Sequence, residues 1–419
     1  MAAVTTPTDW THENAVARLK PLVAFNAVLG VGGGKPAKRL FSLDPADLCA
    51  AARKKSGLDD LGPPTFWDGL VTYTSSFEEE ARPTAMGRMA MRAQLVEALA
   101  ARARVFDWAK AHPEPMATPV APPLMICGLP RTGTTLLSHL FQADPGNRTL
   151  RHFEASDPAP PPVPGQEATD PRMIASYKQL EGLAKLAPGF QAMHPMTPEG
   201  ATECVVLHAQ EMTSVQLETQ GHVPSYAAWL DAQDLHGVYT YERTALQVLQ
   251  HGYDVQRWNL KTPVHLIAFD AIFDLFPDAR MVWTHRDPAE VVVSIASLNT
   301  ALHRVSSDHV DPVAVADHWC ERLAGMVDRG MTYLDAHPDA PITHLAYADM
   351  MADPVGSVAR VYADLDLELS DEARTSIGGW MAEHPQDKHG RHRYRADDFG
   401  LEPARVRDRF APYCERFDT

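Results

Sequence analysis

A short glycine-containing segment, Gly128-Leu-Pro-Arg-Thr-Gly-Thr-Thr135, stands between an apolar run and a helix-like run. Glycines let the backbone approach oxygen atoms closely, and free N–H groups at the start of a helix attract anions. We therefore expect a phosphate-binding loop whose amide donors come from Thr132, Gly133, Thr134 and Thr135. The alternative is an ordinary tight turn between a strand and a helix.

The position of the cation in this segment narrows the chemistry. A nucleoside triphosphatase loop carries Lys after the second glycine, where it reaches the β- and γ-phosphates beside Mg²⁺. Here that position is Thr134, and the cation is Arg131, nearer the front of the loop. A P-loop nucleotide kinase is therefore the disfavoured alternative. A non-catalytic nucleotide-binding protein is a second one.

The segment Pro-Arg131-Thr-Gly-Thr-Thr resembles the 5′-phosphosulfate loop of sulfotransferases that use 3′-phosphoadenosine-5′-phosphosulfate (PAPS), in particular bacterial members. Further segments over roughly residues 85 to 417 follow in family order. The resemblance implies a P-loop-like α/β fold and PAPS as donor, with adenosine 3′,5′-bisphosphate as product. It also implies transfer of a sulfuryl group to a hydroxyl without a required metal.

Two of these segments would surround the phosphate and sulfuryl groups. In ARMVWTHRDPAEVVVSIASL, the resemblance implies that Arg286 and Ser294 hold the 3′-phosphate, and an arginine fork with a serine hydroxyl suits that anion. In Leu-Lys261-Thr-Pro, the lysine would contact the transferring sulfuryl group. Without the other segments, HRDP would be a surface turn and Lys261 a solvated side chain.

Two more segments lie toward the C-terminus. In LAYADM, Tyr347 would lie near the adenine, or would simply pack at the end of a strand. The run DKHGRHRYRADDFGL is strongly basic within an acidic chain, and in the family such a loop closes over the 3′-phosphate. The candidates there are Lys388, Gly390, Arg391 and Arg393, although a charge run is often only a solvated surface.

The acceptor hydroxyl loses a proton as it attacks, so a carboxylate or imidazole within hydrogen-bond reach is expected. Glu154, in RHFEASDP after the loop helix, is the favoured general base, with His152 two residues away. His265 is the rival, because animal cytosolic sulfotransferases have their base just after the corresponding lysine. This chain has Pro263 at that place, so which of the three acts as base is left open.

Methionine and aromatic residues in the middle of the chain could form an adaptable apolar pocket for a small acceptor, although such residues more often form plain core. The acceptor would then be a small, apolar alcohol or phenol. The candidate pocket residues are Met193, His194, Met196, Tyr226, Trp229 and Tyr239.

These residues need a scaffold that brings the ends of several strands together. Short apolar runs predict strands at 124–127, 257–260, 280–284 and 342–345, each followed by a helix-like stretch, as in a mostly parallel sheet flanked by helices. Apolar residues every three or four positions predict one long helix over 77–112. We expect an N-terminal helical region at 1–120 and an α/β domain at 121–419, with helices inserted at about 165–255.

The amino-acid composition limits the binding partners and the cellular compartment that we expect for this protein. The chain has 38 Lys and Arg against 54 Asp and Glu, a formal charge of −16, which disfavours nucleic-acid binding and general attraction to anionic membranes. Five cysteines without CxxC spacing indicate neither a disulfide framework nor a metal site. With no signal-peptide pattern or bilayer-length apolar run, we expect a cytoplasmic protein without stable membrane insertion.

Overall fold

The computed structural model describes residues 9–17, 20–30, 34–189, 196–384 and 391–419. Its centre is a five-stranded sheet in the order β3-β4-β2-β5-β6, in which all neighbouring strands are parallel. The predicted α/β class with a mostly parallel sheet is therefore confirmed. The strands are β2 (Pro123–Gly128), β3 (Asn147–Thr149), β4 (Arg257–Lys261), β5 (Arg280–His285) and β6 (Ile342–Ala346).

The register of the sheet aligns the carboxyl ends of its strands. Ile126 pairs with Lys261 of β4, and Gly128 pairs with Thr284 of β5. Every residue of β2 is buried, as expected for a central strand covered on both faces by helices. In a parallel sheet of this kind, ligands bind outside the carboxyl ends of the strands. Those ends carry most of the residues singled out from the sequence.

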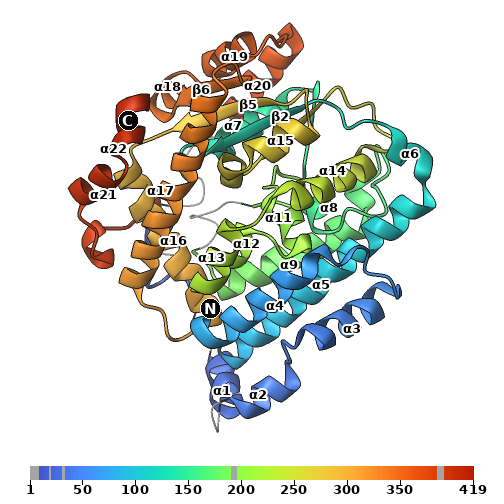
Figure 1. Ribbon diagram of the computed structural model, residues 1–419, viewed down its shortest axis with the longest axis vertical. Helices are drawn as coiled ribbons and strands as arrows, with labels where there is room; N and C mark the ends of the chain where they lie inside the picture. Colours follow the sequence, from blue (N-terminus) through green and yellow to red (C-terminus); the bar gives the residue numbers. More distant parts are fainter. Residues whose placement is uncertain (1–8, 18–19, 31–33, 190–195, 385–390) are drawn as a thin grey trace, which may run out of the picture.

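Helices cover both faces of the sheet (Figure 1). After each core strand the chain turns into a helix or a short helical turn, as the sequence predicted. The helices and turns that follow the core strands are α7 (Thr134–Ala143), α8 (His152–Ser156), η5 (Pro263–Ile267), α15 (Phe269–Leu275), α16 (Pro288–Ser306), α17 (Pro312–Ala336), α18 (Tyr347–Ala352), α19 (Pro354–Asp364) and α20 (Asp371–Glu383).

The inserted middle region and the C-terminus are also helical, as Figure 1 shows on the lower and left sides of the sheet. The middle elements are η3 (Glu167–Thr169), α9 (Pro171–Leu186), α11 (Val205–His208), η4 (Ala209–Glu211), α12 (Val215–Glu218), α13 (Pro224–Asp231) and α14 (His236–Gln250). The C-terminal elements are η6 (Ala396–Phe399), α21 (Pro403–Arg409) and α22 (Ala411–Phe417).

Of the helices before β2, α1, α2, α3 and α4 lie in the lower part of the view in Figure 1, whereas α6 lies at the upper right. The longest, α5 (Ala85–Ala111), packs against α3, α14 and α16 and so joins this region to the rest of the molecule. The division into domains stays a prediction. The other elements here are α1 (Lys20–Leu29), α2 (Lys35–Leu40), α3 (Pro45–Ser56), η1 (Pro64–Phe66), α4 (Trp67–Ser76), the π-helical turn η2 (Phe77–Ala81) and α6 (Pro113–Ala117).

The single helix predicted over 77–112 was wrong at its start. The chain leaves η2 at Arg82, whose φ is +52°, and α5 begins three residues later. Pro83 explains the break, because proline disfavours helical geometry in the residue before it. The side chain of Thr84 then caps α5 by accepting a hydrogen bond from the N–H of Gly87.

The two ends of the chain meet in a second, two-stranded sheet. Strand β1 (Asp9–Trp10) pairs in parallel with β7 (Arg391–His392), and the N–H of Arg393 donates to the carbonyl of Trp10 at 2.8 Å. Trp10 and Ala15 also pack against Ala301 on α16. The N-terminal segment is therefore held beside the basic C-terminal run.

Candidate active site

The predicted phosphate-binding loop joins β2 to α7 in a strained conformation. Gly128, Arg131 and Gly133 all have positive φ, at +130°, +68° and +86°. A Cβ at Gly128 would lie 2.5 Å from the backbone oxygen of Thr284, so only glycine fits where β2 ends against β5. The buried Thr132 hydroxyl lies 2.6 Å from both the carbonyl of Leu129 and the Thr284 hydroxyl. Thr132 thus holds the loop in shape through its side chain.

Arg286 links this loop to the neighbouring strand end. Its Nη1 donates to the carbonyl of Arg131 at 2.9 Å, and its guanidinium lies 4.4 Å from the centre of the Tyr347 ring. The guanidinium of Arg286 also forms an ion pair with the carboxylate of Glu290, one helical turn later, with Nη2 2.5 Å from Oε2. Burial lowers the pKa of Arg131, and the positive charge of Arg286 acts in the same direction. The structure therefore brings Arg131, Arg286 and Tyr347 together.

Ser294 lies two turns into α16, the helix that begins just after Arg286. Its side chain is buried, and its Oγ has no hydrogen-bond partner among the described residues. A buried hydroxyl without a partner loses its hydrogen bonds to water and gains nothing in return. The Ser294 hydroxyl is therefore available for a further hydrogen bond, and its role in binding the 3′-phosphate stays a prediction.

Lys261 ends β4, and its side chain is only 1% exposed. Its Nζ lies 2.9 Å from Oε1 of Glu203 and 3.5 Å from the hydroxyl of Thr135 at the start of α7. The backbone holds this arrangement, because the N–H of Cys204 donates to the carbonyl of Lys261 at 2.9 Å. A carboxylate that the sequence did not single out therefore stands beside the predicted sulfuryl-binding lysine.

Glu154 occupies a different environment from the one expected of a general base. Its side chain is fully buried, and its Oε1 lies 2.8 Å from Arg148 and 2.6 Å from Arg151. Its Oε2 also accepts from the backbone N–H of Arg151 at 3.3 Å, which caps α8. Two arginines and a backbone amide therefore hold this carboxylate in the protein interior. The role of Glu154 as general base stays a prediction.

His265, the rival base, is also fully buried. Its Nδ1 lies 2.7 Å from the hydroxyl of Tyr239, and burial lowers its pKa to about 4. An imidazole with such a pKa stays neutral at pH 7 and accepts a proton weakly. His152 is half-buried, and its Nδ1 lies 3.5 Å from the hydroxyl of Thr202. These histidines bond Tyr239 and Thr202, whereas Glu203 bonds Lys261 directly.

The aromatic candidates for an acceptor pocket lie mainly in the core. Tyr226 and Tyr239 are fully buried, and Tyr226 donates to the carbonyl of Met212 at 2.8 Å. The Trp229 ring stacks on Tyr226, with centroids 5.5 Å apart. These residues belong to the main hydrophobic core or pack against it. Met196 lies at its edge, whereas Met193 and His194 fall outside the described residues.

The basic C-terminal run is only partly described. Arg391 contributes backbone to β7, and the exposed Arg393 follows it, whereas Lys388 and Gly390 lie outside the described residues. Farther on, Arg407 of α21 bonds Asp287 at 2.5 Å, and the hydroxyl of Tyr413 lies 3.2 Å from Nδ1 of His285. The C-terminal helices therefore hold the turn that carries Arg286 from both sides.

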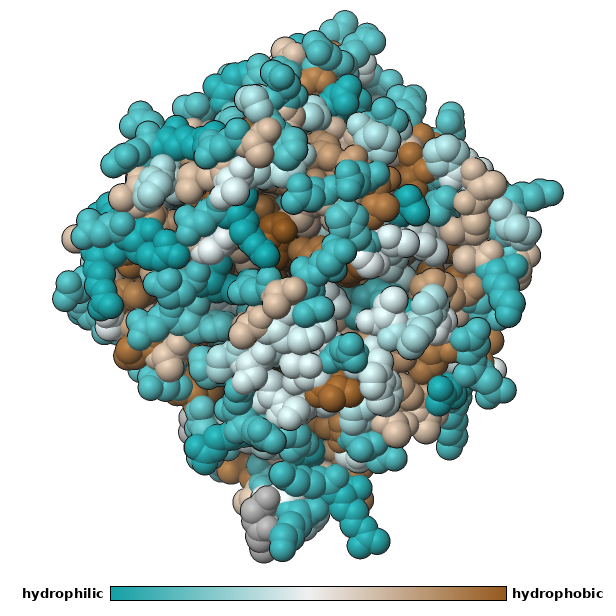
Figure 2. Space-filling view, in the orientation of Figure 1, coloured by the Kyte–Doolittle hydropathy of each residue, from teal (hydrophilic) through white to brown (hydrophobic). Residues whose placement is uncertain are grey.

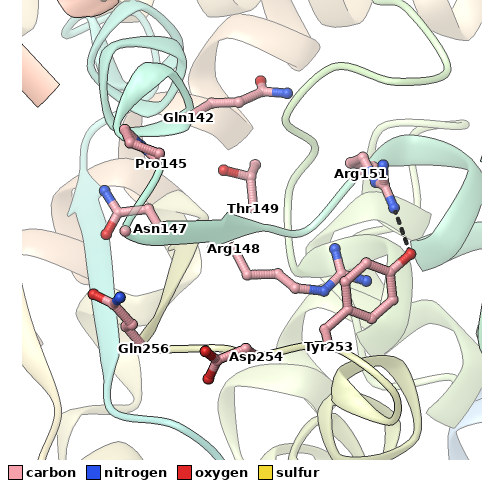
Figure 3. Close-up of a pocket in the computed structure, with 10 residues that line it drawn as sticks. Gln142, Pro145, Asn147, Arg148, Thr149, Arg151, Tyr253, Asp254 and Gln256 are labelled. Carbon is pink, nitrogen blue, oxygen red and sulfur yellow. Dashed lines mark hydrogen bonds between the residues drawn. The ribbon is translucent and has the colours of Figure 1, made fainter. Parts of the chain in front are cut away.

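A polar pocket of about 280 Å³ lies at the β3 edge of the sheet, beside the Glu154 ion pairs (Figure 3). Arg148 extends beneath the ring of Tyr253, at 4.0 Å from its centre, and Arg151 reaches the Tyr253 hydroxyl at 3.4 Å. Both arginines are already paired with Glu154. This pocket contains none of the residues at the loop, β4 or β5 ends, so we distinguish it from the candidate active site.

Within the described part of the chain, no group of three or more His, Cys, Asp or Glu side chains is arranged to hold a metal ion. Over the same residues, every helix is too short or too polar to cross a lipid bilayer.

Comparisons of the sequence and of the structure with known proteins both identify sulfotransferases. Residues 122–371 match the model of the sulfotransferase family. Sulfotransferase STF9 from Mycobacterium avium superposes with a TM-score of 0.82 at 29% identity, over 89% of this chain and 96% of that one. Sulfotransferase STF1 from Mycobacterium tuberculosis superposes with a TM-score of 0.79 at 31% identity, over 88% and 98% of the two chains.

A curated relative in Mycobacterium bovis, the omega-hydroxy-beta-dihydromenaquinone-9 sulfotransferase Stf3, is 24% identical over 280 residues, which is 64% of this chain and 68% of the relative. The family match covers more than half of the chain and contains the loop, Lys261, Arg286 and Ser294. The parallel sheet and the grouping of these residues at its carboxyl edge agree with that match. This chain therefore belongs to the sulfotransferase family.

Proposed function

We propose that this sulfotransferase takes its sulfuryl group from PAPS and transfers it to a hydroxyl group of a small, apolar acceptor. The observation that carries the proposal is that Arg131, Lys261 and Arg286 all lie at the carboxyl ends of the parallel strands. In a chain with a net charge of −16, these cations support a local anion site, even though Lys261 and Arg286 are paired with Glu203 and Glu290.

The donor would lie along this edge, with its 3′-phosphate and its 5′-phosphosulfate bound by different residues. Arg286 and Ser294 would hold the 3′-phosphate, which distinguishes PAPS from other adenylates. The amides of residues 132–135 at the start of α7 would bind the 5′-phosphosulfate, with the side chain of Arg131 beside it. Tyr347, which packs against Arg286, would lie next to the adenine.

The transfer forms a bond between the acceptor oxygen and sulfur and breaks the bond between sulfur and the bridging oxygen of the donor. Negative charge develops on that bridging oxygen, which leaves as part of adenosine 3′,5′-bisphosphate. Lys261 and Arg131 would stabilise this charge, which is the main help that such a reaction needs from a protein.

Glu203 is the residue we assign as general base. Glu154 and His265 are both 0% exposed and engaged in the protein interior, whereas the Glu203 side chain is 22% exposed and lies beside Lys261. An acceptor hydroxyl can therefore approach Glu203 and pass its proton to the carboxylate as it attacks sulfur. Binding of the donor's anionic group at Lys261 would loosen the Lys261–Glu203 ion pair and free the carboxylate for the acceptor hydroxyl.

An apolar acceptor fits the surroundings and the relatives. The inserted region next to Glu203 is rich in buried aromatic and aliphatic residues, including Tyr239 and Leu207. Apolar pockets with a few polar groups are typical of small-molecule sites. The Stf3 relative is named for a hydroxylated, lipid-like menaquinone derivative. By analogy, we propose an alcohol or phenol with an apolar body.

Competition between nucleotides tests the donor assignment. The wild-type chain should bind adenosine 3′,5′-bisphosphate more tightly than AMP, and more tightly than ATP with Mg²⁺, by calorimetry. Arg286→Ala should weaken binding of the bisphosphate by about 10- to 100-fold and leave AMP binding nearly unchanged, because a charge-assisted contact to the 3′-phosphate is lost. Arg280→Ala, at the opposite end of the same strand, is the control. Equal losses for both ligands would refute the 3′-phosphate role.

A further inference from the structure

Helix α1 presents an apolar surface that the rest of the molecule does not cover. Its sequence, KPLVAFNAVL, contains only Lys20 and Asn26 as polar residues, and none of its ten residues is buried. Val23 and Val28 are 55% and 69% exposed, and Leu40 at the end of α2 is 61% exposed. Scattered exposed valines are ordinary, but several on one helix pair form a patch that calls for a partner.

The same segment is basic within an acidic protein. Residues 15–43 contain five Lys and Arg and no Asp or Glu, whereas the whole chain has a formal charge of −16. Among the described residues, Lys20, Lys35 and Arg39 are exposed beside the apolar patch. Lys38 is paired with Glu78 at 3.4 Å. The patch therefore combines apolar side chains with a local positive charge.

Helices α1 and α2 are fixed to each other and to the body of the molecule. The Asn26 side chain accepts a hydrogen bond from the N–H of Met86, near the start of α5, at 2.9 Å. The rings of Phe25 and Phe41 lie 6.2 Å apart and join α1 to α2. In Figure 1 the two helices form the lower tip of the molecule, and in Figure 2 apolar atoms lie beside polar ones there. The patch is thus presented outward on a protruding support.

A groove of about 420 Å³ runs beside α1, between it and the end of α16. Its lining is mixed, with polar and charged residues as well as apolar ones. The apolar residues are Val16, Ala17, Leu22, Val23, Met86, Val305 and Val310, and the polar ones are Glu13, Asn26, Arg304, Ser307 and Asp308. Apolar side chains of α1 therefore continue into the groove, toward the helix that also carries Ser294.

We propose that α1 and α2 form a docking surface for the anionic face of a lipid bilayer, which the enzyme binds reversibly. The surface consists of Lys20, Val23, Val28, Lys35, Arg39 and Leu40. Apolar side chains enter the boundary between headgroups and acyl chains, while lysine and arginine interact with anionic lipid phosphates. The positive charge of this surface is complementary to anionic lipids. The rest of the chain is acidic and would be repelled by them, so this surface would be the part that faces the membrane.

The docking surface is connected to the active site through α16, the helix that carries Ser294. The segment 9–17, which leads to α1, packs on α16 through Trp10 and Ala15. Docking would place α16 and the groove near the lipid phase, where an apolar acceptor would be concentrated. The docking itself is a property of the surface, and it would hold for any donor.

Vesicle sedimentation with the full chain tests the proposal. The chain should bind vesicles of phosphatidylcholine mixed with phosphatidylglycerol, and bind phosphatidylcholine alone much less. Added salt should weaken the binding, because charges at a surface are screened. Val23→Glu/Val28→Glu should lower the partition coefficient by about tenfold or more. Val163→Glu is a matched control, since Val163 is 54% exposed but lies outside the surface.

Charge reversal separates the electrostatic part. Lys35→Glu/Arg39→Glu should also reduce binding by about tenfold or more, whereas Lys54→Glu/Lys110→Glu should have little effect. Equal binding to both kinds of vesicle, or equal losses in the control variants, would overturn the proposal. So would a dimer in sedimentation velocity that Val23→Glu/Val28→Glu dissociates, because a second copy of the chain would then cover the surface.

Discussion

Lys261 and Glu203 form an ion pair, with Nζ 2.9 Å from Oε1, in which the lysine is buried and the carboxylate is partly exposed. In the proposed mechanism, the pair would place a positive charge for the developing leaving group beside a base for the acceptor hydroxyl. Because Lys261 would contact both the donor and Glu203, binding of the donor would change the ion pair.

Glu203→Gln should lower kcat by about a hundredfold or more, since the amide keeps the shape and hydrogen bonding but cannot accept the proton. Binding of adenosine 3′,5′-bisphosphate should change little. The loss should be smaller for acidic phenols, whose hydroxyl is already partly ionised. Turnover with labelled PAPS and a series of acceptors measures this. Near-normal turnover of an alkyl alcohol by Glu203→Gln would remove Glu203 from the role.

Glu154→Gln should act on stability rather than on chemistry. The substitution leaves Arg148 and Arg151 without their buried counter-charge, at a cost of about 3–5 kcal/mol. We expect a clear fall in the denaturation midpoint, with turnover per folded molecule close to that of the wild type. Chemical denaturation and active-site-normalised kinetics separate the two effects. A fully folded but inactive Glu154→Gln enzyme would restore Glu154 as the base.

Ser294→Ala should separate ligand binding from folding. The Ser294 hydroxyl makes no hydrogen bond among the described residues, so its removal should leave the melting temperature unchanged or slightly higher. Affinity for adenosine 3′,5′-bisphosphate should fall about threefold to tenfold, with AMP affinity unchanged. Ser297→Ala, one turn along the same helix, serves as the control. A destabilised Ser294→Ala chain with unaltered nucleotide preference would show that the hydroxyl supports only the fold.

Buried histidines should make the fold sensitive to acid. Burial lowers the pKa of His265 to about 4 and of His303 to about 3, below the usual value near 6.5. Between these values the unfolded chain binds protons that the folded chain does not, so stability is lost as the pH falls below about 6.5. His303→Gln should flatten the pH dependence of the unfolding free energy by about one proton. An unchanged slope would mean that His303 does not contribute.

Within the central sheet, the sequence predicted the strands that carry apolar runs and missed β3, which does not; it also missed the two-residue strands β1 and β7. Strands β2, β4, β5 and β6 lie where apolar residues cluster between turn signals. Strand β3, with the sequence Asn-Arg-Thr, contains no apolar residue and pairs on one side only, at the edge of the sheet. Such a strand is formed by its neighbour rather than by its own residues.

Some residues of the candidate site could likewise be predicted from the sequence, and others could not. Arg131 and Arg286 could be found because each follows a strand within a recognisable segment. Glu203 could not, because nothing near it in sequence marks it, and only the folding of a distant segment against β4 brings it to Lys261. For Glu154, the sequence placed the carboxylate after the loop helix, but its ion pairs with Arg148 and Arg151 could be seen only in the folded chain.

The pairing of β1 with β7 bears on how the protein is completed during synthesis. One strand consists of Asp9 and Trp10 and the other of Arg391 and His392, so the small sheet joins opposite ends of the chain. The N-terminal strand has no partner until β7 has been translated, when only the last helices of the chain remain to be made. A chain cut short before β7 would leave its first strand unpaired, and it would also lack Phe410 and Tyr413, which pack in the main core.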